Sequence, residues 1–474
     1  MAQPRGPPRD PLVAIVGATG TGKSQLAVDL AKRFNGEIIN GDAMQMYAGL
    51  PIITNKIPES EREGVPHHLL GCVGLAEETW RVGIFIEKAL GVIKEIRSRG
   101  RVPILVGGTH YYTQALLFQD TLAHAEAGDG ESGNVGGILT KEEVSSKYPI
   151  LDGSTEEILS RLREVDPIMA DRWHPNDHRK IRRSLEIYLM TGQRASDIYQ
   201  KQHERRSGTE MEDGDGPSDT GAGADEASVK EHLGRFPVLL LWTHTAPERL
   251  QARLNSRVDD MVRNGMLSEV WEMDAFLDEG SSRGVTVDKT RGVWVSIGFK
   301  EFEAYTSALK TDNVSEEEAE MFKAEAIEKT KIATRQYAKG QVRRIRIKLL
   351  HALKAAELEQ NLFLLDASEP GDWVTDVQKP AGDLVKQFLA GEELPAATSL
   401  SQAAEEMLVP LKDYDLSQRR ELWTRETCET CGVTSVVPQD WARHLRSRGH
   451  RRRVQKAMKR QQRAESGHAE NENG

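Results

Sequence analysis

The chain has 474 residues, a formal net charge of −10 and three cysteines. This length allows two or three domains, and three cysteines are too few for a disulfide framework. It contains no apolar run of about 18 residues and its start, MAQPRGPPRDP, fits neither a signal nor a transit peptide, so we expect no membrane span and a cytosolic location, leaving a mitochondrial or nuclear share open. The acidic total disfavours nucleic acid, but lysine and arginine gather in the C-terminal third, where a local field can attract a polyanion.

The first strong motif follows the apolar run 12–16, which predicts a strand. The segment GATGTGKS at 17–24 matches G-x-x-x-x-G-K-[ST], and the apolar residues after it recur at helical spacing. In such a loop the backbone N–H groups bind a di- or triphosphate, Lys23 adds a positive charge, and the Ser24 hydroxyl can reach Mg²⁺. The alternative, a glycine-rich turn that binds nothing, is disfavoured by the regular flanks.

Two further strands are predicted at 37–40 and 101–106. Asp42 follows the first, and Gly107, Gly108 and Thr109 follow the second. Because the carboxyl ends of parallel strands meet at one crevice, Asp42 is expected near the phosphate loop, where it can accept a proton or bind Mg²⁺ through water; capping the next turn is the alternative. An NTP-hydrolysing enzyme usually has a magnesium-binding Asp where Gly107 stands, so another chemistry is favoured.

The middle of the chain combines a helical segment with two low-complexity stretches. Residues 121–153 read as a loose excursion, and the acidic stretch 207–227 cannot bury enough apolar area to order itself. Between them, Asn176 or Asp177 is expected to cap a helix, and Pro175 disfavours a zinc site at His174 and His178. Arg179, Arg182 and Arg183 lie off the apolar stripe of this helix, where they either bind phosphates or are simply solvated.

The run 236–242 predicts a strand that is buried on both faces, and Thr245 to Glu248 has the pattern of a capping box. The next helix places Arg253 and Arg257 in a row on one face, and an arginine near its start is expected to act as a second clamp on a leaving phosphate; a surface salt bridge to Asp260 is the alternative. Farther on, Lys331, Arg335, Lys339 and Arg343 are spaced four apart, a row that can follow a sugar-phosphate backbone.

The C-terminal part carries the second strong motif, C-x₂-C-x₁₂-H-x₅-H, formed by Cys428, Cys431, His444 and His450. Two thiolates and two imidazoles satisfy a tetrahedral structural Zn²⁺. The third cysteine, Cys72, is expected to be a buried small hydrophobe. Past the finger, a cationic segment that includes Arg451, Arg452, Arg453 and Lys456 is expected to contact RNA or to serve as a nuclear address.

Taken as an ordered set, these segments resemble the eukaryotic tRNA dimethylallyltransferases, also called tRNA isopentenyltransferases. The resemblance rests on the phosphate loop and the zinc finger together with GDAMQMY at 41–47, PIITNK at 51–56, REGVPHHL at 62–69, VGGTHYY at 106–112, HPNDHRKIRRSLEIY at 174–188, RVDDM at 257–261, SIGFKEF at 296–302 and TRQYAKGQV at 334–342. It covers most of the chain outside the two low-complexity stretches and the linker at 391–416.

The resemblance implies transfer of a dimethylallyl group from dimethylallyl diphosphate to N6 of the adenosine 3′ to the anticodon, releasing diphosphate. It assigns Asp42 as general base and places Thr19 and Arg257 on the diphosphate, with Ser24 near Mg²⁺. The diphosphate-binding loop would comprise Gly17, Ala18, Thr19, Gly20, Thr21, Gly22, Lys23 and Ser24. The residues that would contact tRNA are Asp42, Gln45, Thr109, Asn176, Asp177, Arg179 and Arg182.

The predicted architecture is α/β, a P-loop-type parallel sheet with a helical insertion domain and a C-terminal zinc finger. The expected boundaries are 11–120 with 233–390 for the catalytic core, 121–232 for the insertion, 391–416 for a linker and 417–463 for the finger and basic helix. We expect a monomer whose partners are the tRNA anticodon stem-loop and dimethylallyl diphosphate, with Mg²⁺ and structural Zn²⁺ as cofactors.

Three other functions fit parts of the sequence. A nucleotide-dependent kinase or NTPase is disfavoured by Gly107 and Gly108, and an RNA-binding protein with a vestigial loop is disfavoured by intact Lys23, Ser24 and Asp42. An enzyme that prenylates free adenine nucleotides is disfavoured by the finger and the basic row. One departure from the family pattern, Gly340 in place of a common arginine, weakens the basic helix as an RNA clamp.

Overall fold

The structure is a computed structural model that describes residues 6–77, 79–118, 144, 146–200, 234–282, 287–311, 314–409, 425–436 and 438–469. The acidic stretch 207–227 and most of the excursion at 121–153 lie outside these residues. The chain divides into two compact units, one formed by 1–122 with 220–410 and the other by 123–219 with 411–474. Each unit is described by itself.

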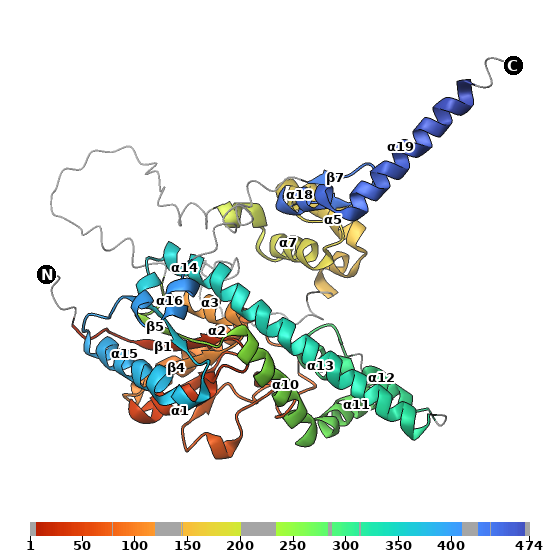
Figure 1. Ribbon diagram of the computed structural model, residues 1–474. Helices are drawn as coiled ribbons and strands as arrows, with labels where there is room; N and C mark the ends of the chain where they lie inside the picture. Colours follow the sequence, from red (N-terminus) through yellow and green to blue (C-terminus); the bar gives the residue numbers. More distant parts are fainter. Residues whose placement is uncertain are drawn as a thin grey trace, which may run out of the picture. The chain divides into compact units, whose positions relative to one another are not determined.

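The first unit is built on a six-stranded sheet in which every pairing is parallel, in the order β3-β2-β4-β1-β5-β6 (Figure 1). The strands are β1 (Leu12–Gly17), β2 (Gly36–Asn40), β3 (His67–His68), β4 (Val102–Gly107), β5 (Val238–His244) and β6 (Leu362–Asp366). The parallel α/β class predicted from the sequence is therefore confirmed.

Helices cover both faces of this sheet. Val13 and Ile15 of β1 pack in the cluster with α1 and α15, whereas Leu12, Ala14 and Val16 pack in the cluster with α2, α3 and α14. A strand covered on both faces reads as an unbroken apolar run, which is the pattern of β1 and β5. The helices of this unit are α1 (Lys23–Arg33), α2 (Val82–Ser98), α3 (His110–Leu117), α10 (Pro247–Arg263), α11 (Met266–Ser282), α12 (Phe299–Leu309), α13 (Glu316–Arg344), α14 (Leu350–Ala355), α15 (Lys379–Ala390) and α16 (Gln402–Met407).

The strand order places the functional loops together. From central β1 the chain passes over the position of β4 to form β2, and it later returns to β4 and then to β5 on the other side of β1. Because all these strands run the same way, the loops after β1, β2, β4 and β5 emerge at one edge of the sheet. Long helix α13 packs against both α10 and α12 (Figure 1).

Three local expectations differ from the structure. Residues 391–409 were expected to be linker, but α16 packs against β6 and Ala404 is fully buried. Thr245 was expected to cap α10, but the N-cap is Ala246, and the buried Thr245 hydroxyl instead accepts from Arg253 and donates to the Ala367 carbonyl. Cys72, expected to be buried, is exposed.

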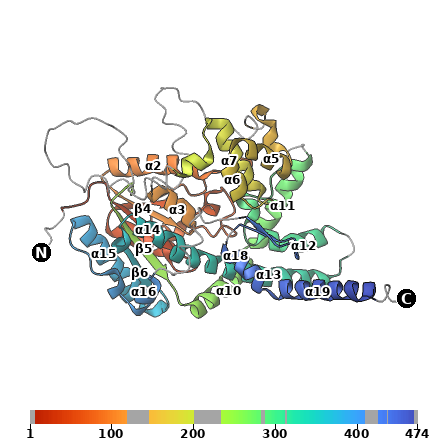
Figure 2. The same cartoon turned by 90° about the horizontal axis from the view of Figure 1, so that it is seen from above.

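The second unit contains a small helical core and the finger. Helices α5 (Thr155–Val165), α6 (Pro167–Arg172) and α7 (His178–Thr191) share one apolar cluster, and Asp177 caps α7 by accepting the Lys180 N–H at 3.2 Å. The finger comprises the hairpin β7 (Glu426–Thr427) and β8 (Thr434–Ser435), then α18 (Pro438–Arg446) and α19 (Arg448–Ala469), which appear in blue in Figure 2. Within the described part of the chain, no helix is both long and apolar enough to cross a bilayer.

Candidate active site

The loop between β1 and α1 has the tight geometry of a phosphate cradle. Gly17 has a φ of +152°, and a Cβ on it would lie 2.5 Å from the Thr243 carbonyl oxygen, so only glycine fits against β5. Thr21 is buried, donates to the Ala18 carbonyl at 2.9 Å and shares a 2.7 Å hydrogen bond with the Thr243 hydroxyl. Thr243 of β5 therefore holds the loop in place through its contacts with Gly17 and Thr21.

Lys23 and Asp42 come from different loops and influence each other electrostatically. The Lys23 ammonium donates to the Ala18 carbonyl at 2.7 Å, and burial lowers its pKa to about 8 against an opposing contribution from Asp42. Burial likewise raises the pKa of Asp42, although the N–H of Met44, 3.0 Å from the carboxylate, and the charge of Lys23 oppose the rise. A carboxylate with a raised pKa beside a lysine suits a general base near an anion site.

Arg257 reaches the same loop from α10. Its Nη1 donates to the Thr19 hydroxyl at 2.7 Å, and burial lowers the pKa of its guanidinium below the ordinary value. The alternative partner Asp260 forms its ion pair with Arg263 instead. The guanidinium therefore lies beside the loop that follows β1.

The loop after β4 contacts the loop that carries Asp42. Thr109 accepts the Ala43 N–H at 3.2 Å, and the Gln45 amide donates to the Asn55 carbonyl at 3.0 Å. Next to Thr109, His110 is buried, and its ring nitrogens have no hydrogen-bond partner among the described residues. Burial first, then the nearby charges of Lys23 and Arg344, lower the pKa of His110 to about 3, so its imidazole is neutral at physiological pH.

The basic row of α13 divides into two pairs. Lys331 forms an ion pair with Asp259 at 2.6 Å, and Arg335 donates to Asn255 at 2.6 Å, so these two cations tie α13 to α10. Lys339 and Arg343 are exposed. Two of the four predicted phosphate contacts are thus engaged inside the protein.

The predicted RNA-contacting residues of the second unit cluster at the start of α7. Asp177 is the cap, the Asn176 N–H donates to His174 at 3.1 Å, and Arg179 is exposed. Arg182 is largely internal, donating to the Leu151 carbonyl at 3.0 Å and pairing at 3.4 Å with buried Glu186. Within this set, Arg179 is the cation that faces solvent.

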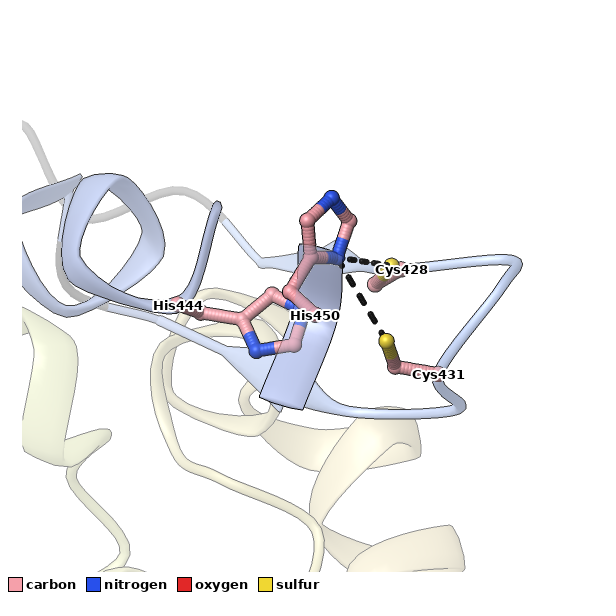
Figure 3. Close-up of side chains that lie close together, drawn as sticks. All are labelled: Cys428, Cys431, His444 and His450. Carbon is pink, nitrogen blue, oxygen red and sulfur yellow. Dashed lines mark hydrogen bonds between the residues drawn. The ribbon is translucent and has the colours of Figure 1, made fainter. Parts of the chain in front are cut away.

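The finger brings its four predicted ligands together (Figure 3). One ligand atom each from Cys428, Cys431, His444 and His450 lies within 4.8 Å of the others, and among the described residues this is the one such group of three or more. His450 Nδ1 is 3.6 Å from one sulfur and 3.4 Å from the other, and buried His444 Nε2 has no hydrogen-bond partner. A tetrahedron with Zn–S bonds of about 2.3 Å separates its ligand atoms by slightly less than about 4 Å, which both His450–sulfur distances meet, and two thiolates with two imidazoles are a donor set that suits zinc.

Comparison with known proteins decides the family. A family model described as IPP transferase matches residues 45–348, and one described as isopentenyl transferase matches residues 11–69. A tRNA dimethylallyltransferase of Schizosaccharomyces pombe is 34% identical over 470 residues, covering 96% of this chain and 97% of the relative. The chain belongs to the tRNA dimethylallyltransferase family.

Other members of the family agree with this assignment. The tRNA dimethylallyltransferase of Saccharomyces cerevisiae is 33% identical, with 93% of this chain and 91% of the relative covered. A solved structure of a eukaryotic dimethylallyltransferase acting on tRNA superposes with a TM-score of 0.73 at 31% identity, covering 96% of this chain and 99% of the other. This chain is accordingly a transferase of that family.

Two residues at the site were not singled out from the sequence. Gln341 of α13 contacts both the phosphate loop and the loop after β4. Glu269 of α11 accepts the N–H groups of Ile52 and Ile53 at 2.8 and 2.7 Å and so anchors the segment that carries Asn55, the partner of Gln45. One signal was available: each is a polar residue inside a buried helical stripe, which requires a polar partner.

Proposed function

We propose that this protein transfers a dimethylallyl group from dimethylallyl diphosphate to N6 of the adenosine 3′-adjacent to the anticodon of tRNA. The observation that carries the proposal is the pairing of a phosphate cradle with a carboxylate of raised pKa, Asp42, from the neighbouring loop. Family membership supports transfer of a dimethylallyl group to tRNA, because the relatives carry that activity in their names.

In the proposed reaction the N6 lone pair forms a bond to the allylic carbon while the bond from that carbon to the diphosphate oxygen breaks. Diphosphate leaves with the electron pair, and the N6 proton passes to Asp42. An exocyclic amine is a weak nucleophile, so a positioned base lowers the barrier by accepting this proton. The environment of Asp42, partly buried and within the electrostatic influence of Lys23, supports that role.

The leaving group is stabilised by donors that are already in place. The Lys23 ammonium and the Arg257 guanidinium both contact the loop 17–24, at Ala18 and Thr19, and we propose that they bind the diphosphate together with backbone N–H groups of that loop. Preorganised donors of this kind stabilise negative charge as it develops. Ser24, exposed in the first turn of α1, offers one hydroxyl for Mg²⁺, an ion that usually keeps several waters and binds substrate phosphates, and the ion would supply further charge neutralisation.

For the RNA, we propose that Gln45 and Thr109 hold the extruded adenine beside Asp42 and that Asn176, Asp177, Arg179 and Arg182 contact the stem-loop. Unstacking a base costs a few kcal/mol and is easiest in a single-stranded loop, which favours an anticodon loop as substrate. Lys339 and Arg343 supply exposed cations for the backbone.

We also propose a structural Zn²⁺ held by Cys428, Cys431, His444 and His450, which would stabilise the fold of the finger. Arg451 and Lys456 on α19 are exposed and offer additional phosphate contacts. Free thiolates need a reducing compartment, which supports a cytosolic location and is compatible with a share in the nucleus or mitochondria. We propose that the protein acts as a monomer.

The test is a transfer assay with radiolabelled dimethylallyl diphosphate and three acceptors: an anticodon stem-loop with adenosine 3′ to the anticodon, the same RNA with guanosine there, and AMP. We expect label in the first acceptor only. Asp42→Asn should lower kcat by about 10²- to 10⁴-fold, the range for a lost general base, while Asp376→Asn at an exposed position should not. Phosphate release from ATP without labelled RNA, or an Asp42→Asn variant as fast as wild type, would overturn the proposal.

A further inference from the structure

One buried side chain joins the two halves of the active site. Gln341 is 1% exposed, and its amide Oε1 accepts the Thr19 N–H at 2.8 Å while its Nε2 donates to the Gly108 carbonyl at 3.0 Å. Thr19 is 322 residues away in the sequence and Gly108 is 233 residues away. A single primary amide thus bridges the loop after β1 and the loop after β4.

The backbone of Gly108 connects Gln341 to Asp42, the proposed base. A Cβ on Gly108 would lie 2.4 Å from Gln341 Nε2 and 3.1 Å from Asp42 Oδ2, so Gly108 is held between the amide and the carboxylate. Its N–H also stabilises the ionised form of Asp42. The position of Gln341 is therefore transmitted to the carboxylate through the backbone of a single residue, Gly108.

On the other side, Thr19 connects Gln341 to the leaving-group site. The Thr19 N–H is bound by Gln341, and its hydroxyl is bound by Arg257 at 2.7 Å. Helix α13, which carries Gln341, is itself fixed to the helix of Arg257 by the Lys331–Asp259 ion pair and the Arg335–Asn255 hydrogen bond. The amide is consequently held in place from both ends.

Packing alone does not explain a glutamine here. Around Gln341, Ala338 and part of Val342 of α13, and Ile345 just beyond its end, are buried among apolar neighbours, so the surroundings would also accept an apolar side chain. Without the amide, the Thr19 N–H and the Gly108 carbonyl would lose their partner, and an unsatisfied buried backbone group is costly. Four residues after Gln341, α13 gives way to a π-helical segment, Ile345–Leu349, a feature that often lies at functional sites.

We propose that Gln341 is a positioning residue that fixes the distance between the diphosphate cradle and Asp42, so that the allylic carbon and the base act on the same nitrogen. The inference rests on the proposed function of the site. Misplacement of reacting groups by about 1 Å can lower a rate by about 10²-fold, so the expected effect of losing the bridge is on kcat.

The experiment compares Gln341→Leu, which removes both hydrogen bonds at similar volume, with Gln341→Glu, which can still accept the Thr19 N–H but cannot donate to Gly108. Gln402→Leu, at an exposed glutamine of α16, is the matched control. Thermal unfolding establishes that each variant is folded. Transfer to the anticodon stem-loop is measured from pH 5 to 9, and deuterium uptake is measured in peptides spanning 17–24 and 106–112.

For Gln341→Leu we expect kcat to fall by about 10²-fold with KM for the RNA within threefold, and the acid limb of kcat to move to higher pH because Asp42 loses support from Gly108. Deuterium uptake should rise in both peptides together. In Gln341→Glu it should rise in 106–112 alone, which also tests the bridge if the leucine variant does not fold.

A kcat within threefold of wild type, or a lower kcat with an unmoved acid limb and unchanged deuterium uptake, would show that Gln341 only fills space. Failure of the wild-type protein to label RNA would instead defeat the proposed function. In that case the deuterium readout would still decide whether Gln341 bridges the two loops.

Discussion

The contact between Arg257 and Thr19 yields a quantitative prediction for catalysis. The Arg257 side chain is partly buried, donates to the Thr19 hydroxyl at 2.7 Å, and lies beside the loop expected to hold the leaving diphosphate. Removing one preorganised donor to a developing oxyanion costs about 2.7–4 kcal/mol, which is about 10²- to 10³-fold in kcat. We therefore expect Arg257→Gln to lower kcat by that factor, and Arg257→Lys to lose less because it keeps the charge without the planar fork.

Steady-state transfer of label to the anticodon stem-loop measures this effect, and Arg253→Gln provides the control. Arg253 lies one turn earlier on α10 but donates to Thr245 and to the Ser368 carbonyl, so its loss should lower the melting temperature and leave kcat within threefold. Thr19→Val completes a double-mutant cycle with Arg257→Gln, in which we expect non-additive losses. If Arg257→Gln retained kcat within threefold, or if Arg253→Gln lost as much, the assignment of Arg257 to the leaving group would be wrong.

Three other predictions follow from charge and helix geometry. Because the pKa of Lys23 is lowered to about 8, its charge is lost above that pH in the free enzyme. We therefore expect kcat/KM for dimethylallyl diphosphate to fall above about pH 8, while kcat, measured with bound anion, stays level to higher pH. Basic limbs of kcat/KM and kcat that fall at the same pH would refute this. Hydrogen bonds from Arg99 hold the pKa of buried Glu37 at about 2, below its ordinary 4.5. At 1.36 kcal/mol per pKa unit, ionised Glu37 contributes about 3 kcal/mol to the free energy of unfolding, which is complete above pH 4.5 and lost as pH falls towards 2. Urea unfolding of Glu37→Gln should show that loss at pH 7 and little loss at pH 2. Gly340 lies inside α13 with open space around it, so Gly340→Ala should raise the free energy of unfolding by about 1 kcal/mol, and Gly340→Arg should steepen the salt dependence of RNA binding; an unchanged slope would exclude contact there.

Features that depend on neighbours in the sequence were predictable. The glycines, Lys23 and the flanking strand and helix of the phosphate loop lie within about twenty residues, and the local pattern alone defines the turn. Cys428 and His450 were likewise predictable as partners, because thiolate and imidazole spacing in a finger is set by a short hairpin and a helix. Asp42 could be placed because every strand of the sheet runs in the same direction.

Features that depend on distant segments were missed or misassigned. The pattern around Thr245 fits a capping box, yet its hydroxyl is taken by Arg253 and the chain after β6, which no local rule includes. Lys331 and Arg335 have the spacing of a phosphate-binding row, but α10 packs alongside and offers them partners. Local spacing sets which face a side chain occupies and does not determine what lies opposite.

The sequence by itself determined which chemical groups are available: a phosphate loop that contains Lys23, a carboxylate after the next strand, and a finger with four potential metal ligands. Only the tertiary structure decided how these groups are held, through Arg257 on the Thr19 hydroxyl and Gln341 between Thr19 and Gly108. The reason is that covalent spacing specifies contacts over a few residues, whereas contacts across hundreds of residues exist only after the sheet and its covering helices have packed.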